Sequence, residues 1–430
     1  MSILIENAAI LPMTGENSLI QKGYLIINND IIEHIGAGAA PPGSYRRVID
    51  GSGQAVLPGL INTHTHAAMT LLRGYADDLP LMEWLSTKIW PLEAKLNGED
   101  IYWGTMLAIA EMIKSGTTTF NDMYFFMDQA ARAVEESGMR ALLSRGMIGV
   151  SPENQIALDD SRKLVEQWHG AARGRIRFAL GPHAPYTCPP EYLQKVAALA
   201  DELEVGIHIH IAETRQEVED IVKQYGMSPV RLMLANGVFK HPTLAAHCVH
   251  LNEDDIAILK DYQVGVAHNP ESNMKLASGI APVPAMLKAG IAVGLGTDGA
   301  SSNNNLDMIQ EMRSCALLHK VNSMDPTVLP AYQALEMATA LGAKALGWDD
   351  EIGMLKPGYK ADLILIDLNA AHMIPHYDIV ANIVYSAQAA DVDTVIIDGQ
   401  IVMENRRVTQ FDEQEVLAKC QALARDLIAR

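Results

Sequence analysis

Two histidines, His64 and His66, stand one residue apart at the end of a short apolar stretch that begins at Leu57. On a β-strand, residues two apart point to the same face, so both imidazoles can be aimed at one point. Neutral imidazole is a good ligand for zinc and iron. A pair of this kind is by itself more often packed or solvated than metal-bound, so the rest of the chain has to decide its role.

Later apolar segments also end in residues that can bind a metal or transfer a proton. In chain order these residues are His183, His208, His210, Glu213, His247, His250, His268 and Asp298. Because scattered core histidines would not gather at strand ends, this pattern predicts a metal site. Three histidines plus a carboxylate, with one position open for water, make the ligand set of a catalytic zinc-type site. A metal bound there would lower the pKa of its water to about 7.

The spacing leaves part of the ligand set open. His208 and His210 lie on the same face of one strand, so either could bind the metal. The preceding strand ends in His183, and not in a lysine that could be carbamylated to bridge two metals. The sequence therefore predicts one divalent ion for each chain.

The elements that must position these residues alternate between short apolar strands and longer segments of helical period, such as 101–115, 128–137 and 190–203. The predicted strands are Val56–His66, Gly116–Tyr124, Arg140–Gly149, Arg175–Pro185, Val205–Glu213, Leu244–His250, Gly265–Pro270 and Ala292–Gly299. Alternation of this kind predicts an α/β fold, a (β/α)₈ TIM barrel. In such a barrel the active site lies at the carboxyl ends of the strands, where the residues above stand.

The two ends of the chain have β character. Segments 2–10, 23–27 and 31–35 are apolar and β-branched, and 394–403 reads as a hairpin with an Asp-Gly turn before a terminal helix over 412–430. Neither end is large enough to bury a core alone. We therefore expect a small β-sandwich domain formed by residues 1–56 and 351–430, beside a barrel of residues 57–350.

The amino-acid composition and the net charge limit the kinds of partner and the cellular location that can be expected for this chain. The chain has 430 residues, is 49% hydrophobic and carries a formal charge of -19, which argues against nucleic-acid or membrane partners. Four widely spaced cysteines without a C-x-x-C motif are typical of reduced thiols. The N-terminus lacks a basic region followed by a long apolar core. The expected location is the cytoplasm.

Several segments together resemble the amidohydrolase superfamily and, within it, the 5′-methylthioadenosine/S-adenosylhomocysteine deaminases. The resemblance covers nearly the whole chain. It rests on the segments PGLINTHTHAAMTLLRGYADDLPLMEWL, GTTTFNDMY, HIHIAET, AAHCVHL, HNPESNMKLASGIAP and GLGTDGASSNNNLDM. It implies a barrel of the metal-dependent hydrolase type and deamination of adenosine derivatives by a metal-activated hydroxide.

The resemblance also implies a role for each matching residue. The metal ligands would be His64, His66, His210 and Asp298, for one ion that is zinc or, alternatively, iron. His210 is preferred over His208 because the family places the ligand three residues before a glutamate. Glu213 would protonate the ring nitrogen N1 and later help ammonia leave, Asp298 would take the proton from the attacking water, and His247 would hydrogen-bond the hydroxide.

For the substrate, the resemblance implies that His183 contacts the purine, Glu93 binds the ribose hydroxyls and Arg145 meets the carboxylate of a homocysteine tail. Each has a simpler alternative, since Glu93 could be a surface glutamate and Arg145 could pair with a barrel acid. The family can carry a second arginine shortly after this position, but residues 151–158 contain none. His208 and His250 are interpreted as structural histidines, and His268 as either structural or supporting the site.

Two other functions stay open at this level. One is a deaminase or dechlorinase of another heterocycle, such as guanine or a triazine, although a ribose-binding Glu93 favours a nucleoside. The other is a non-catalytic barrel without metal, which would be expected to lack ligands, whereas every expected ligand is present in the sequence. The sequence does not rank the adenosine derivatives, nor does it decide whether the chain forms a homo-oligomer.

Overall fold

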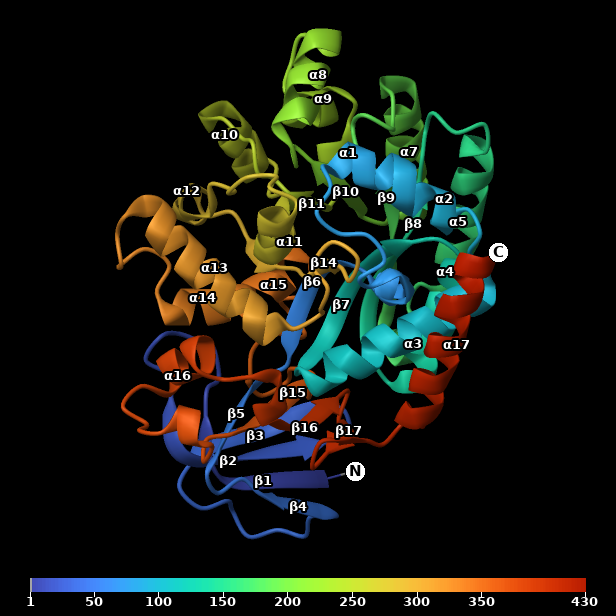
Figure 1. The fold of residues 1–430 in the computed structure, drawn as a ribbon. Helices are drawn as coiled ribbons and strands as arrows, with labels where there is room; N and C mark the ends of the chain where they lie inside the picture. The colour runs from blue at the N-terminus through green and yellow to red at the C-terminus, as the bar shows by residue number, and fades with distance from the viewer. Residues whose placement is uncertain (1) are drawn as a thin grey trace.

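A parallel sheet curled into a barrel forms the centre of the computed structural model, which describes residues 2–430 (Figure 1). Its strands follow the chain in the order β6 (Leu60–His66), β7 (Thr117–Tyr124), β8 (Arg140–Met147), β9 (Ile176–Pro182), β10 (Ile207–Ile211), β11 (Thr243–His247), β12 (Gly265–His268), β13 (Val293–Leu295) and β14 (Asp298–Gly299). The last two are pieces of one strand: β13 pairs with β12 and β14 pairs with β6, which joins the two ends of the sheet. The predicted α/β barrel fold is confirmed.

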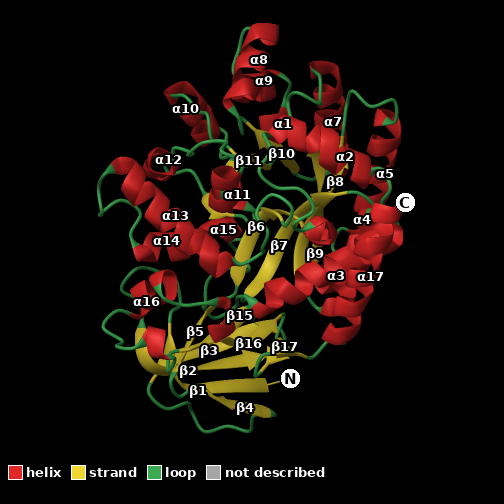
Figure 2. Cartoon of the chain, viewed as in Figure 1, coloured by secondary structure: helices red, strands yellow, loops and turns green. Residues whose placement is uncertain are grey.

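Helices surround this sheet (Figure 2). Those that follow or precede strands are α3 (Gly98–Lys114), α4 (Met127–Ser137), α5 (Asn154–Trp168), α7 (Pro190–Leu203), α8 (Arg215–Tyr225), α10 (Glu253–Asp261), α12 (Val283–Ala289) and α13 (Met308–Ser323). Local sequence explains where they begin. At α3, Asn97 and Asp100 form a reciprocal capping box that satisfies two free amides of the first turn. The predicted helices over 101–115, 128–137 and 190–203 are confirmed.

The two ends of the chain form a second, mixed sheet below the barrel (Figures 1 and 2). Its strands are β1 (Ser2–Ile10), β2 (Ile20–Asn28), β3 (Ile31–Ala37), β4 (Arg47–Asp50), β5 (Gln54–Pro58), β15 (Leu363–Asp367), β16 (Val392–Ile397), β17 (Gln400–Glu404) and β18 (Arg407–Val408). The N- and C-terminal parts join where β5 pairs antiparallel with β15, Leu57 opposite Ile364. A separate apolar core fills this sheet, with residues such as Ile5, Leu25 and Leu365 fully buried.

One predicted strand, Val56–His66, is wrong as a single element. Residues up to Pro58 belong to β5 in the small sheet, and β6 begins at Leu60 in the barrel. Between them, the amide of Gly59 donates to Asp362 O in the small domain at 3.0 Å. A side chain on Gly59 would meet Thr118 at 2.1 Å, so only glycine lets the chain pass this close to β7. The sequence stays apolar where the chain passes from β5 in the small sheet to β6 in the barrel. Hydrophobic periodicity therefore gave no sign that one strand ends and another begins there.

The C-terminal segment follows the expected pattern. Asp398 and Gly399 both have positive φ angles, 51° and 72°, as a tight hairpin turn between β16 and β17 requires. The terminal helix α17 (Glu413–Ala429) packs against α3 on the outside of the barrel (Figure 1). In residues 2–430, no helix combines the length and the apolar character needed to cross a membrane.

Candidate metal centre and active site

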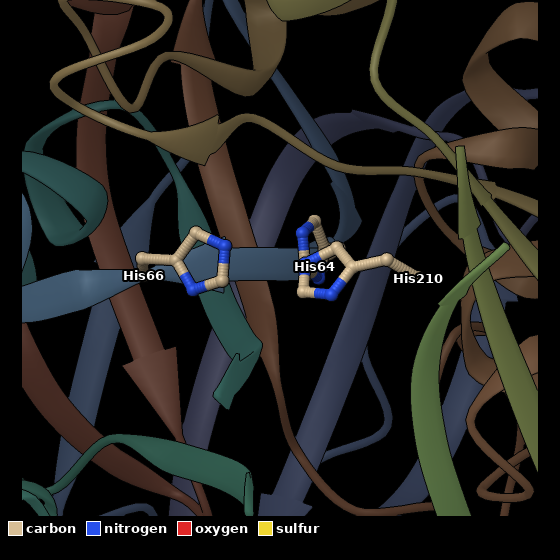
Figure 3. Close-up of side chains that lie close together, drawn as sticks. All are labelled: His64, His66 and His210. Atoms are coloured by element: carbon tan, nitrogen blue, oxygen red, sulfur yellow. The ribbon is translucent and has the colours of Figure 1, made fainter. Parts of the chain in front are cut away.

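Three histidines converge at the carboxyl ends of two barrel strands (Figure 3). His64 and His66 extend from β6 and His210 from β10, and their nearest ring nitrogens all lie within 4.8 Å of one another. Strand alternation accounts for His64 and His66 meeting on one side, as the sequence predicted. Barrel closure then brings β10 opposite β6, which no local pattern specifies.

The second ring nitrogen of these histidines is anchored by the backbone. His66 Nδ1 donates to Met123 O at 2.7 Å, and His210 Nδ1 donates to His183 O at 2.6 Å. In the neutral form of each ring the proton is held on Nδ1, so Nε2 is the nitrogen left for a metal. The two rings are therefore oriented toward a common point.

His64 is anchored by a relay of side chains. Its Nδ1 lies 2.9 Å from His208 Nε2, and His208 Nδ1 lies 3.2 Å from Ser144 Oγ, which donates to Asp122 O. This chain of bonds is satisfied when His64 carries its proton on Nδ1 and keeps Nε2 bare. In agreement, the buried His64 Nε2 has no hydrogen-bond partner. His208 thus holds His64 from behind through a hydrogen bond, in line with its predicted structural role.

A carboxylate completes the cluster. Asp298 Oδ1 lies 3.4 Å from His64 Nε2 and 3.3 Å from His66 Nε2. Its other oxygen accepts hydrogen bonds from Ser272 Oγ at 2.7 Å and Ser302 Oγ at 3.1 Å. In a tetrahedral zinc site the ligand atoms are ~3.3 Å apart, given metal–ligand bonds of ~2.0–2.1 Å. The spacing of these donors therefore fits one ion.

Burial and the neighbouring carboxylate set the charge of the three histidines. Burial lowers the pKa of His64 to about 4 and that of His210 well below the usual value, so both rings are neutral at neutral pH. For His66, burial also lowers the pKa, but the contacts with Asp298 and Met123 O outweigh it and raise the pKa to about 9, so this ring can share a proton with Asp298. Neutral imidazole is the form that binds metal. A metal ion would replace the proton between His66 and Asp298, so three anchored imidazoles and one hydrogen-bonded carboxylate fit a divalent metal.

Two potential proton-transfer groups lie beside the cluster. Glu213 lies two residues after the end of β10, and its Oε2 is 3.8 Å from His247 Nε2 at the end of β11. Burial raises the pKa of Glu213, which makes the protonated form more available near neutral pH. His247 Nδ1 lies 3.0 Å from Asn273 Oδ1 and 3.2 Å from Asn269 Nδ2, so the ring is held from behind with Nε2 facing Glu213. The ligand atoms of His64, His247 and Asp298 also lie within 4.8 Å of one another.

A cavity opens above these residues. Its polar lining includes His66, Glu93, His183, His210, Glu213, His247 and Asp298, and most of the rest is apolar or aromatic. Glu93 ends the short helix α2 (Trp90–Glu93), and its Oε1 accepts a hydrogen bond from Tyr124 at 2.7 Å. Burial raises the pKa of Glu93. Glu93 therefore faces the cavity, as expected if it contacts a substrate. One of its two carboxylate oxygens already accepts the hydrogen bond from Tyr124.

Arg145 does not line this cavity. It lies in a neighbouring cavity of about 590 Å³, where its Nε is 3.7 Å from Asp160 Oδ2 and Lys163 stands nearby. The two cavities share Phe125, Gly146 and Ile148 as lining residues. The ion pair is the alternative that the sequence left open for Arg145, while the shared wall places Arg145 next to the histidine cavity.

The remaining histidines have structural partners. His250 Nε2 donates to Ser278 O at 2.7 Å. His268, Cys315 and His319 form a second buried cluster, in which the two Nε2 atoms are 3.1 Å apart. Both Nδ1 atoms there lack a partner, whereas metal-binding imidazoles almost always have one. We therefore interpret this cluster as a hydrogen-bonded core pair beside a thiol.

Sequence reasoning missed several groups that hold the site. Tyr124, Ser272 and Asn273 contact Glu93, Asp298 and His247 respectively. For Ser272 and Asn273 the available signal was the largely polar run Asn269–Asn273, which directly follows a buried strand. Nothing in the sequence distinguishes its members by the partner that each would reach.

Comparison with known proteins agrees with this geometry. The model of the amidohydrolase family matches residues 55–402. A 5-methylthioadenosine/S-adenosylhomocysteine deaminase of Syntrophomonas wolfei is 68% identical over 431 residues, covering 100% of both chains.

Solved structures have the same fold. A zinc-bound adenosine deaminase from Xanthomonas campestris superposes with a TM-score of 0.95 at 36% identity, covering 100% of this chain and 99% of that one. The zinc complex of the atrazine chlorohydrolase from Arthrobacter aurescens reaches 0.91 at 25% identity, covering 98% of this chain and 100% of that one. With a family model and a full-length relative both matching, this chain belongs to the amidohydrolase family, among relatives named 5-methylthioadenosine/S-adenosylhomocysteine deaminases.

Proposed function

We propose that the protein hydrolytically deaminates adenosine derivatives, 5′-methylthioadenosine, S-adenosylhomocysteine or both, to the inosine analogues and ammonia. The proposal rests mainly on one observation: a relative that is 68% identical over the full length is named 5-methylthioadenosine/S-adenosylhomocysteine deaminase. The site supports it independently, because a metal-ligand set, an adjacent buried acid and a mostly apolar cavity occur together.

In this proposal His64, His66, His210 and Asp298 hold one divalent ion. Zinc is preferred over iron because the adenosine deaminase and the atrazine chlorohydrolase of the same fold are zinc complexes. When bound, such an ion lowers the pKa of a coordinated water to about 7, which makes hydroxide available at neutral pH. Asp298 accepts the proton of the attacking water. Its second oxygen is held by Ser272 and Ser302, so the carboxylate keeps its orientation as it changes charge.

The neighbouring groups serve the purine ring. Glu213 protonates N1 while oxygen adds to C6. The proton that Asp298 took from the water then passes, with the help of Glu213, to the leaving nitrogen so that ammonia departs. The remaining hydroxyl proton returns to Glu213 as the C6 carbonyl forms. His247 hydrogen-bonds the attacking oxygen through Nε2, while Asn273 holds the other side of its ring. His183 contacts the purine. General acid–base help of this kind is worth about 10²–10⁴-fold in rate.

The substrate contacts divide between the two cavities. Glu93 binds ribose hydroxyls with the oxygen that Tyr124 leaves free. Arg145, from the neighbouring cavity, meets the carboxylate of a homocysteine tail that passes the shared wall of Phe125, Gly146 and Ile148. Lys163 lines the same cavity and adds a second positive charge where the sequence lacks a second arginine.

We further propose that the protein acts in the cytoplasm on a freely diffusing small molecule. All four cysteines are free and buried, as expected for reduced thiols. The net charge of -19 disfavours binding to nucleic acid or anionic lipid.

One assay tests the proposal. Ammonia release and loss of adenine absorbance are measured with 5′-methylthioadenosine, S-adenosylhomocysteine, adenosine, guanine and a chlorinated triazine. We expect turnover of the adenine nucleosides only. Faster turnover of guanine or of the triazine would contradict the proposal and favour the alternative heterocycle.

A further inference from the structure

The loop that carries Glu213 has an unusual backbone. Ala212, between β10 and Glu213, has a φ angle of 54°, in the left-handed region that non-glycine residues rarely adopt. This turn ends the strand and directs the next side chain, Glu213, into the histidine cavity. A strained conformation persists only where surrounding groups hold it.

A buried carboxylate holds the loop from one side. Glu217, in the first turn of α8, is 6% exposed and accepts hydrogen bonds from the amides of Ala212 and Glu213, one on each oxygen, both at 2.8 Å. From the other side, the carbonyl of Ala212 accepts bonds from the amides of Val249 and His250 at 3.0 Å each. The peptide groups around the left-handed residue are thus fixed on both faces.

Helix capping does not explain this arrangement. In a capping box the third helical residue reaches back to the amide of the cap, which here would join Glu217 to Thr214. Thr214 does accept from the Glu217 amide at 3.1 Å, but the Glu217 side chain passes it and reaches Ala212 and Glu213. The carboxylate therefore serves the loop before the helix.

We propose that Glu217 is a positioning residue for Glu213, acting through the two amides that its carboxylate clamps. The inference rests on the proposed function of Glu213 as the acid that protonates the purine. Glu217 does not line the cavity, so it touches no substrate and acts only through the backbone. Two acceptor oxygens are required, because a glutamine would present its NH₂ group to one of the amides.

The chemistry of the site explains why such a group is retained. A second carboxylate buried close to Glu213 is unfavourable, and burial raises the pKa of Glu217 to about 7. The two amide bonds oppose that shift by stabilising the charged form. If position 217 only had to fill space in the core, an apolar side chain would be more favourable there than a carboxylate.

A double-mutant cycle tests the proposal in the zinc-loaded protein. Glu217→Gln should lower kcat about 10- to 100-fold, with KM within about twofold and metal content unchanged, since small misplacements of a catalytic group have large effects. In a Glu213→Gln background the same substitution should have no further effect on kcat. Equal losses in both backgrounds would show a general structural role and overturn the proposal. Glu219→Gln, on an exposed position of the same helix, is the matched control.

Hydrogen exchange tests the clamp without any substrate. Amides of Ala212 and Glu213 should exchange at least about tenfold faster in Glu217→Gln than in the parent or in Glu219→Gln, because one amide loses its acceptor. Unchanged protection would overturn the proposal, whatever reaction the protein catalyses. A parent protein that fails to deaminate any nucleoside would instead contradict the proposed function alone. Should Glu217→Gln not fold, Glu217→Asp retains the charge but shortens the reach, and the same increase in exchange is expected.

Discussion

The histidine cluster and the Arg145 cavity are neighbours with different physical character. In the cluster, the His64 side chain is fully buried, Asp298 is 7% exposed, and each ring nitrogen facing away from the centre has a partner within 3 Å. In the other cavity, Arg145 is 19% exposed and donates to Gly146 O, but its charged neighbours Asp160 and Lys163 are 39% and 72% exposed, and the nearest opposite charges are more than 3.5 Å apart. Hydrogen bonds in a buried site are costly to break, whereas exposed ion pairs contribute little.

This difference separates two tasks. Groups that must keep one geometry through a reaction lie in the buried cluster, where hydrogen bonds fix the orientation of each side chain. Groups that could select a substrate tail lie at the solvent-exposed cavity, where charges can change partner at little cost. Substitutions should therefore have large, substrate-independent effects in the cluster and small, substrate-dependent effects in the cavity.

Removing one ring of the cluster should have the largest effect. We expect His64→Ala to lose the bound metal and to lower kcat/KM at least about 10³-fold for every substrate, because the ion loses a ligand at its most buried side. Elemental analysis of the purified protein, alongside activity, measures both. His34→Ala, an exposed histidine in the small domain, should change neither. A His64→Ala protein with about one ion per chain would contradict the ligand assignment.

Within the cluster, the acid should be separable from the metal. Glu213→Gln is expected to retain about one ion per chain and lose at least about a hundredfold in kcat on all substrates, because its role is proton transfer. Metal content and turnover are measured on the same preparation. Loss of the ion in this variant would make Glu213 a ligand and the proposed role wrong.

Glu93 lines the histidine cavity without belonging to the metal-ligand set, and its effect should depend on the sugar. Its removal in Glu93→Ala should cost about 1.5–3 kcal/mol, or roughly 10–150-fold in kcat/KM, for nucleosides with a complete ribose. The measurement compares adenosine with 2′-deoxyadenosine in the parent and the variant. Tyr124→Phe is the companion variant, as it removes only the hydroxyl that occupies Oε1. If Glu93→Ala distinguished the two sugars as well as the parent does, the ribose contact would be ruled out.

The smallest effect should come from the exposed cavity. Arg145→Ala should lower kcat/KM for S-adenosylhomocysteine about three- to tenfold and leave 5′-methylthioadenosine within twofold, because only the former has a carboxylate to pair. Asp160→Asn should act in the opposite direction, since it frees Arg145 from its ion pair. Equal losses on both substrates in Arg145→Ala would show that the arginine is structural, and the contrast between the two regions would no longer hold.

Local patterns predicted most elements of the fold to within a few residues. The alternating apolar segments became eight barrel strands, and the Asp-Gly turn and terminal helix occur where composition placed them. The errors lie where an apolar run hides a change of direction. At Gly59, one continuous apolar run divides into two strands that belong to different sheets. The predicted strand over 205–213 ends at Ile211, because Ala212 has a left-handed backbone conformation.

The sequence by itself determined which side chains gather at one end of the barrel, because alternation along a strand decides the face on which His64, His66, His208 and His210 project. The sequence did not determine how deeply each of these side chains is buried or how far apart they lie. Only the tertiary structure decided that His208 lies behind His64 as a hydrogen-bond partner while His210 faces the centre, and that Arg145 lies in the neighbouring cavity. The clamp of Glu217 on the Glu213 loop is likewise a tertiary result. Such contacts depend on how strands close and loops bend over many residues, and periodicity within one segment carries no information about either.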